Sequence, residues 1–247
     1  MKNRDNVILF RSVASRKRAS FDREDQIGNF GNHGNSGNEH MRSLRSLLRR
    51  TPFYGAYKSA GHYPDYWYWK LRGEPVRPPH LVKQRTVRDY TERYGLTVLV
   101  EAGTYYGEMV AAMKNHFDEI YSVEYDHALA ARAQKKFARW PHIHIIEGDS
   151  QKVIPEVVAK LRQAALFWLD AGYYGWAGTH GNRQRLTTEL DAILSARTDH
   201  IILMDDAHGL NGQSGAPTVE QLKQQIESRF PGRVVEVRQN ILRITNR

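Results

Sequence analysis

Carboxylates follow the stretches that the sequence predicts to be buried strands. The acids at these positions are Glu101, Glu124, Asp149, Asp170, Asp205 and Asp206. In an open α/β sheet the carboxyl ends of parallel strands meet at one edge, and ligands bind there. Clustered like charges raise one another's pKa values and cost stability, so a purely structural sheet has no reason to gather them. We therefore expect a ligand site at this edge.

A turn bracketed by glycines follows the first of these strands. Gly103 and Gly107 follow Glu101, and a helical pattern then places apolar side chains on one face: Met109, Val110, Met113 and Phe117. Glycine suits a turn whose backbone passes close to a ligand. Glu124 lies 21 residues beyond Gly103, close to the roughly 20-residue spacing at which a carboxylate reaches the ribose of a bound nucleoside. The pattern predicts a nucleotide-binding βαβ unit.

The turn does not suit a dinucleotide. The dinucleotide fingerprint needs three glycines so that a helix N-terminus can approach a pyrophosphate, but the second and third positions here are Tyr105 and Glu108. Tyrosine blocks the close backbone approach, and a glutamate at the helix start would repel phosphate. A nucleoside without phosphates is favoured, and a nicotinamide oxidoreductase is the least favoured enzyme class.

Three motifs in this order resemble class I S-adenosylmethionine-dependent methyltransferases. They are Glu-x-Gly-x-x-x-Gly at 101–107, the acid Glu124, and Gly148-Asp149-Ser150. The resemblance covers residues 96–247, and residues 52–95 look like the leader of bacterial members. It implies a doubly wound, mainly parallel seven-stranded sheet that ends in an antiparallel hairpin.

The same resemblance implies the cofactor and its contacts. Glu124 would hold the ribose of S-adenosylmethionine, Asp149 with Ser150 would flank the adenine, and residues 103–107 would pass along the methionine part. The full set of implied cofactor residues is Glu101, Gly103, Thr104, Tyr105, Tyr106, Gly107, Glu124, Tyr125, Asp149 and Ser150.

A metal site is implied by a narrower resemblance. Small-molecule O-methyltransferases of the catechol and macrolide-sugar kinds bind a divalent ion with acids that follow the fourth and fifth strands, and Asp170, Asp205 and Asp206 are similar. Three oxygen ligands suit octahedral Mg²⁺, which would orient an acceptor hydroxyl and lower its pKa. The alternative is that Asp170 caps a loop and Asp206 faces solvent.

The catalytic base departs from the family pattern. Related bacterial chains carry a histidine two residues after the fourth-strand acid, and this chain has a glycine at 172; catechol enzymes place a lysine where Tyr173 stands. His208 and His180 are the candidate replacements. We take Asp170 and His208 as the predicted catalytic residues.

Charge and composition limit the remaining kinds of site and the expected location of the protein. The net charge is +9, and residues 1–90 hold 18 Lys/Arg against 8 Asp/Glu, whereas residues 91–247 hold 18 against 19. This places the excess positive charge outside the predicted catalytic core. The chain has no cysteine, which excludes thiolate metal sites and cysteine nucleophiles. The apolar run at 7–10 is too short for a signal peptide or membrane span, so we expect a cytoplasmic protein.

Three regions are expected. Residues 1–40, with a Gly/Asn repeat, form a disordered tail, and residues 41–95 form a basic, aromatic, helical extension. Its aromatic run at 53–69 would cover an edge of the core or, less favoured, stack on bases or sugars. Residues 96–247 form the methyltransferase domain. Its expected elements alternate: helices at 127–140, after a Ser150 cap, at 188–197 and from Pro217, and strands at 142–146, 164–169, 200–204, 233–237 and 241–245.

Three functions remain open. The leading one is methyl transfer from S-adenosylmethionine to a hydroxyl of a small molecule or glycan, with or without Mg²⁺. The first alternative is an RNA methyltransferase, because the basic leader could attract nucleic acid. The second is a cofactor-binding module without catalysis, which the glycine at 172 would explain.

Overall fold

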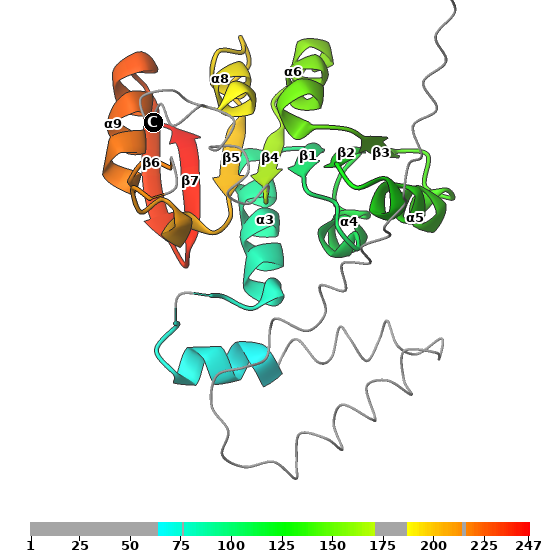
Figure 1. Ribbon diagram of the computed structural model, residues 1–247, viewed down its shortest axis with the longest axis horizontal. Helices are drawn as coiled ribbons and strands as arrows, with labels where there is room; N and C mark the ends of the chain where they lie inside the picture. Colours follow the sequence, from blue (N-terminus) through cyan, green and yellow to red (C-terminus); the bar gives the residue numbers. More distant parts are fainter. Residues whose placement is uncertain (1–63, 76, 171–186, 214–215) are drawn as a thin grey trace, which may run out of the picture. The chain divides into compact units, whose positions relative to one another are not determined.

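One seven-stranded sheet organises the protein. The computed structural model describes residues 64–75, 77–170, 187–213 and 216–247, and its strands lie in the order β3-β2-β1-β4-β5-β7-β6 (Figure 1). The expected disordered tail at 1–40, the first part of the helical extension (41–63) and the loop at 171–186 lie outside the described residues. The predicted doubly wound α/β architecture is confirmed.

Five parallel strands form the centre and one side of the sheet. They are β1 (Val98–Ala102), β2 (Glu119–Glu124), β3 (Ile143–Glu147), β4 (Leu166–Leu169) and β5 (Ile201–Met204). All residues of β1 and β4 are buried, as expected for parallel strands that helices cover on both faces.

The predicted C-terminal hairpin completes the sheet. β6 (Arg233–Arg238) pairs antiparallel with β7 (Ile241–Asn246), and β7 pairs antiparallel with β5. Gln239 and Asn240 between them both have positive φ, which is the backbone form that a tight hairpin turn requires.

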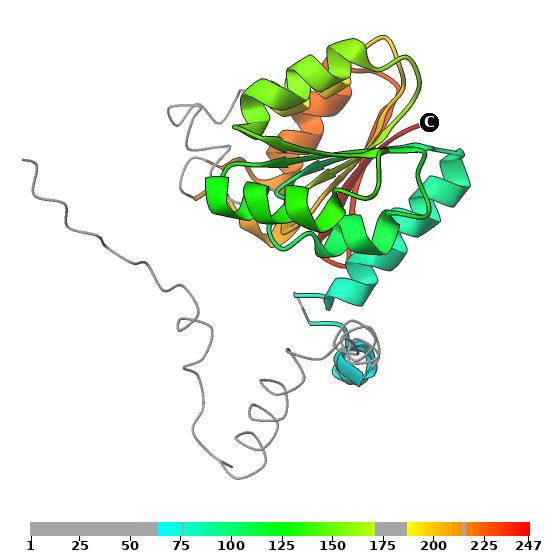
Figure 2. The same cartoon turned by 90° about the vertical axis from the view of Figure 1, so that its right-hand side faces the viewer.

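Helices cover both faces of the sheet (Figure 2). One face carries α3 (His80–Tyr94), α4 (Glu108–Met113) and α5 (His127–Phe137), whose buried residues share one apolar cluster with the sheet. The other face carries α6 (Ser150–Lys160), α8 (Thr188–Leu194) and α9 (Val219–Arg229), which form a second cluster. The short 3₁₀-helix η1 (Ala207–Gly209) follows β5.

Two helix starts differ from the sequence prediction. Asp149, not Ser150, caps α6, because its carboxylate accepts a hydrogen bond from the Gln151 amide. A carboxylate at this position also faces the positive end of the helix dipole. Helix α9 begins at Val219 rather than at Pro217, and Thr218 caps it: its hydroxyl and the side chain of Gln221 form a capping box.

Helix α3 belongs to the packed domain although it precedes the predicted boundary at residue 96. It lies against α4 and β4, and Val82, Thr86, Val87 and Tyr90 are buried. The basic residues of α3 therefore stand on the domain itself. This corrects the expectation that all excess positive charge lies outside the catalytic core.

Within the aromatic run at 53–69, the residues from 64 onward are described, and their side chains are in part buried and in part exposed. Residues 64–71 are helical, and Trp69 is buried with its indole N–H donating to the Pro75 carbonyl at 2.8 Å. Trp67 and Tyr68 are exposed. Within the described ranges, no helix combines the length and the apolar character needed to cross a bilayer.

A buried histidine links the amino ends of β4 and β5. His200 is 1 % exposed; its Nδ1 accepts from the Ala165 amide at 3.1 Å, and its carbonyl accepts from Arg233 at 2.6 Å. Burial, with a smaller contribution from Arg233, lowers the pKa of His200 to about 4. The folded state therefore holds this imidazole neutral.

This histidine should make stability pH-dependent. Its folded pKa lies below its ordinary value of 6.5, so its contribution is fully present above pH 6.5 and is lost as the pH falls toward 4. His200→Asn keeps an acceptor near the Nδ1 position but removes the titration. Between pH 6.5 and 4, urea unfolding of the wild type should lose on the order of 2–3 kcal/mol more than the variant. Equal losses in both proteins would contradict this assignment.

Candidate active site

Backbone hydrogen bonds bring the carboxyl ends of the parallel strands to one edge. The Asp170 amide donates to the Ala102 carbonyl at 3.1 Å, and the Asp205 amide donates to the Leu169 carbonyl at 3.0 Å. On the other side of β1, the Gly148 amide donates to the Glu124 carbonyl at 2.8 Å. The predicted gathering of acids is therefore present.

The glycine turn lies at the centre of this edge. The amides of Gly103 and Thr104 both donate to the Val123 carbonyl, at 2.9 and 3.2 Å. Gly103 has φ +93°, and a Cβ there would lie 3.0 Å from the Asp170 carbonyl oxygen. Only glycine allows β1 and β4 to approach so closely at this point.

Glu124 holds the turn from the neighbouring strand. One carboxylate oxygen accepts from the Tyr105 amide at 2.6 Å, and the other accepts from the Asp126 amide at 2.9 Å. Glu124 is 8 % exposed. A carboxylate has about four acceptor positions, so both oxygens keep a lone pair for hydroxyls of a ligand above the turn.

Glu101 lies beneath the same turn in a chain of side-chain hydrogen bonds. It accepts from the Ser122 hydroxyl at 2.5 Å, and that hydroxyl lies 2.6 Å from the Thr104 hydroxyl. Burial, against the opposing Ser122 hydrogen bond and with smaller contributions from the charges of Asp170 and Glu124, raises the pKa of Glu101 to about 8. At neutral pH Glu101 is therefore mainly a neutral acid, and a nearby cation would favour its ionised form.

Aromatic rings and basic side chains surround the turn. Tyr105 and Tyr125 are exposed, and the rings of Tyr105 and Tyr106 lie 4.1 Å apart. Lys136 of α5 donates to the carbonyls of Tyr106 and Gly107 at 2.7 and 3.0 Å. The lysine thus fixes the end of the turn from outside.

The predicted adenine side contains an acid that sequence reasoning missed. Glu189 of α8 is 5 % exposed, and one of its carboxylate oxygens has no hydrogen-bond partner among the described residues. Burial raises its pKa, a hydrogen bond from Ser150 lowers it, and the charge of Asp149 raises it. Asp149, Ser150 and Glu189 therefore stand together where α6 and α8 begin.

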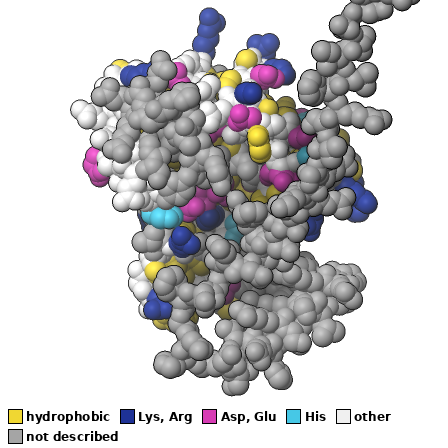
Figure 3. All heavy atoms as spheres, viewed as in Figure 1, with side chains coloured by type: hydrophobic (Ala, Val, Ile, Leu, Met, Phe, Trp, Pro, Cys, Tyr) yellow, Lys and Arg dark blue, Asp and Glu magenta, His cyan; other side chains and the backbone are white. Residues whose placement is uncertain are grey.

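The acids after β4 and β5 enclose a lysine. Lys83, in the first turn of α3, forms an ion pair with Asp205, whose side chain is fully buried. Asp170 and Asp206 lie close enough to act on the Lys83 charge, and with Asp205 they raise its pKa although burial opposes this. On the face seen in Figure 3, acidic side chains lie next to Lys or Arg and His side chains.

Asp170 itself reaches solvent, but protein atoms crowd its carboxyl group. This partial removal of water, together with the charge of Asp205 and against the opposing charge of Lys83, raises the pKa of Asp170 to about 7. Asp170 and Asp205 therefore do not carry two free negative charges at neutral pH.

The three predicted magnesium ligands do not fit a Mg²⁺ ion as they stand. Asp205 is paired with an ammonium group. Asp206, with φ +54°, turns its carboxylate toward the Asn240 amide at 3.3 Å. Among the described residues, no three carboxylate, histidine or cysteine side chains converge on one point.

His208 faces the C-terminal hairpin. Its Nδ1 lies 3.0 Å from the Asn240 side-chain oxygen and 3.8 Å from an Asp206 oxygen, and its amide donates to Asn240 at 2.8 Å. The structure thus positions His208 next to Asp206 and records no contact with Asp170. His180 and Tyr173 lie outside the described residues.

Comparison with solved structures gives the fold a name. A protein from Staphylococcus aureus described as a caffeoyl-CoA O-methyltransferase superposes with a TM-score of 0.51 over 85 % of this chain and 98 % of its own, at 11 % identity. The chain has the class I methyltransferase fold. An S-adenosylhomocysteine-bound methyltransferase from Podospora anserina reaches 0.49 over 88 % and 100 % at 15 % identity, and an O-methyltransferase from Bacillus cereus 0.49 over 76 % and 91 % at 11 %. No family model and no curated protein matches the sequence.

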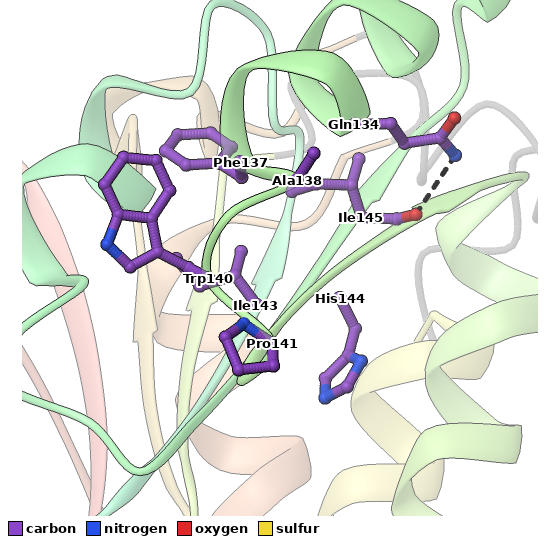
Figure 4. Close-up of a pocket in the computed structure, with 8 residues that line it drawn as sticks. All are labelled: Gln134, Phe137, Ala138, Trp140, Pro141, Ile143, His144 and Ile145. Carbon is purple, nitrogen blue, oxygen red and sulfur yellow. Dashed lines mark hydrogen bonds between the residues drawn. The ribbon is translucent and has the colours of Figure 1, made fainter.

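In this methyltransferase fold a cavity of about 400 Å³ opens away from the acidic edge. It lies between the end of α5 and β3, and Trp140, Pro141 and His144 are among its lining residues (Figure 4). None of the predicted site residues lines it. We do not assign the cofactor to this cavity.

The sequence carried a signal for Lys83. It lies four residues before buried Val87, on the face of α3 that packs against the sheet. A lysine inside a buried stripe needs an acidic partner. Glu189 lies beside the buried Leu190 of α8 and had no comparable signal, because an acid in a first turn is ordinary.

Gly107 should tolerate alanine less well than a matched glycine. Gly107 and Gly95 both have φ near +60°, but a Cβ at Gly107 would lie 2.6 Å from the Phe137 ring, whereas one at Gly95 meets nothing within 4 Å. Each Gly→Ala change costs roughly 1–2 kcal/mol for the backbone. Thermal unfolding should show a clearly larger loss for Gly107→Ala, because the Phe137 ring must also move. Equal losses would mean that the turn is not packed against α5.

Proposed function

We propose that the protein is an S-adenosylmethionine-dependent methyltransferase that acts on a hydroxyl group of a small molecule or a glycan. The observation that carries the proposal is Glu124, whose carboxylate binds the backbone of the Gly103–Gly107 turn and keeps free lone pairs beside it. The fold supports the proposal, because it places this carboxylate and the turn at the ligand-binding edge of the sheet.

The charges of the edge support a cationic nucleoside. The charges of Glu124 and Asp170 both act on Glu101 through space, and α4 begins with Glu108, which disfavours phosphate. A sulfonium with an amino group would reduce the repulsion among these acids. Tyr125 and the group formed by Asp149, Ser150 and Glu189 then offer stacking and hydrogen-bonding partners for an adenine.

Asp170 is the best-placed group for the acceptor side. A Cβ at Gly103 would lie 3.0 Å from the Asp170 carbonyl oxygen and 3.9 Å from the Asp170 Cβ, so Asp170 stands next to the turn along which the methionine part would run. A carboxyl group there can hold an acceptor hydroxyl and take its proton as the methyl group is transferred. The second predicted catalytic residue, His208, remains a candidate for a relay through Asp206.

Titration calorimetry with S-adenosylmethionine tests the cofactor site. Glu124→Gln should weaken binding at least about tenfold, because two charge-assisted hydrogen bonds to the ribose become weaker. Glu147→Gln is the matched control, since Glu147 pairs with Glu124 in register at the end of β3 but is exposed. It should bind like the wild type. No binding by the wild-type protein would refute the proposed function.

One surface favours the RNA alternative. Arg132 and Lys135 of α5 and Arg139 in the turn after it are exposed, and the Arg132 guanidinium lies 4.7 Å from the centre of the Tyr106 ring at the glycine turn. Basic groups interleaved with aromatic rings can bind a single-stranded backbone. This stripe begins at the turn, as an RNA substrate would require.

Filter binding to single-stranded poly(U) separates the two functions. If RNA is the substrate, replacing Arg132, Lys135 and Arg139 with glutamine should reduce the salt slope of binding by about 2. Lys152→Gln with Lys160→Gln on α6, on the opposite face of the sheet, should leave the slope unchanged. If the acceptor is a small molecule or glycan, the α5 variant and the α6 control should give the same slope.

A further inference from the structure

A lysine stands where the related metal-dependent pattern would place a cation. Its helix α3 leads through a short connection into β1, so α3 runs antiparallel to the strands and its first turn reaches their carboxyl ends (Figure 1). From there the Lys83 side chain contacts Asp205, which is 122 residues away in sequence. The contact joins the segment before the sheet to the end of β5.

The geometry of this pair leaves the ammonium group partly free. Asp205 has a fully buried side chain, and its second oxygen accepts from the Asp206 amide at 2.9 Å. The Lys83 side chain is 20 % exposed, and an ammonium group has three N–H donors. Asp205 is therefore held from inside the protein through both of its oxygens, and the partly exposed Lys83 ammonium keeps donors for a further partner.

We propose that the Lys83 ammonium group is a built-in substitute for a divalent cation at the ends of β4 and β5. Asp205 fixes it, Asp170 and Asp206 lie near enough for their charges to act on it, and its remaining N–H groups would bind the acceptor oxygen. The alternative, that the pair only pins α3 to the domain, predicts no exposed face for the lysine and no acids other than Asp205 around it.

The chemical role of this cation rests on the proposed function. In the transfer, a C–O bond forms between the acceptor oxygen and the methyl carbon, and the C–S bond breaks with its electron pair going to sulfur. The hydroxyl proton leaves to a carboxylate of the edge and then to water. A fixed ammonium next to the acceptor oxygen stabilises the negative charge that develops there, as a metal ion would.

Binding of Mn²⁺, followed by electron paramagnetic resonance, tests the substitution without any methyl acceptor. Lys83→Ser removes the ammonium and leaves the buried Asp205 carboxylate without its cation, so that its oxygens, with those of Asp170 and Asp206 nearby, become available to a hard cation. The variant should bind one Mn²⁺ at least tenfold more tightly than the wild type. Lys83→Ser with Asp205→Asn should lose this gain. Lys223→Ser removes a surface ion pair with Glu227 and is the matched control, expected to behave as wild type.

Each outcome decides the proposal. A folded Lys83→Ser variant that gains no Mn²⁺ affinity would overturn it, because the carboxylates would then not form a cation seat. Tight stoichiometric binding by the wild type, abolished by Asp205→Asn, would also overturn it, since metal and lysine would not compete. If Lys83→Ser unfolds, Lys83→Gln takes its place in the same Mn²⁺ measurement, and the wild-type measurement still tests the proposal. Loss of S-adenosylmethionine binding would sink the proposed function but leave the Mn²⁺ result standing.

Discussion

Repulsion among carboxylates at one edge of the sheet is the constraint on which the site depends. The fold gathers acids there, and each acid is stabilised in a different way. Burial keeps Glu101 largely protonated, and two backbone amides donate hydrogen bonds to Glu124. Asp149 caps the N-terminus of α6, and Lys83 forms an ion pair with Asp205. Because some of these carboxylates keep acceptor positions that the protein does not use, this edge can bind one more positive charge, such as a sulfonium, at a low cost in free energy.

The contacts that stabilise this edge also join segments that are distant in the sequence. Glu124 of β2 holds the turn after β1, Lys136 of α5 holds the end of that turn, and Lys83 connects α3 to β5. The helix that precedes the sheet is thereby part of the site rather than an accessory. The C-terminal hairpin contributes too, because Asn240 holds both Asp206 and His208.

Local patterns predicted the strands, most helices and the gathering of acids. Buried apolar runs define β1, β4 and β5, and the spacing from Gly103 indicated an acid at the end of the next strand, where Glu124 binds the glycine turn through the Tyr105 amide. One local detail was predicted one residue off, because neighbouring Asp149 and Ser150 can both cap a helix and Asp149 caps α6. The metal triad inferred by resemblance failed because of tertiary contacts: Asp205 pairs with Lys83, and Asp206 with Asn240. The sequence shows that Lys83 lies on the inner face of a helix, but only the fold places that helix beside β5.

The central claim is that the acidic edge binds a sulfonium nucleoside through Glu124. A crystal structure of the complex with S-adenosylhomocysteine tests it most directly. The account predicts ribose hydroxyls within hydrogen-bonding distance of Glu124 and the homocysteine part along residues 103–107. Ligand density in the cavity beside Trp140, with Glu124 bonded only to the protein backbone, would contradict it.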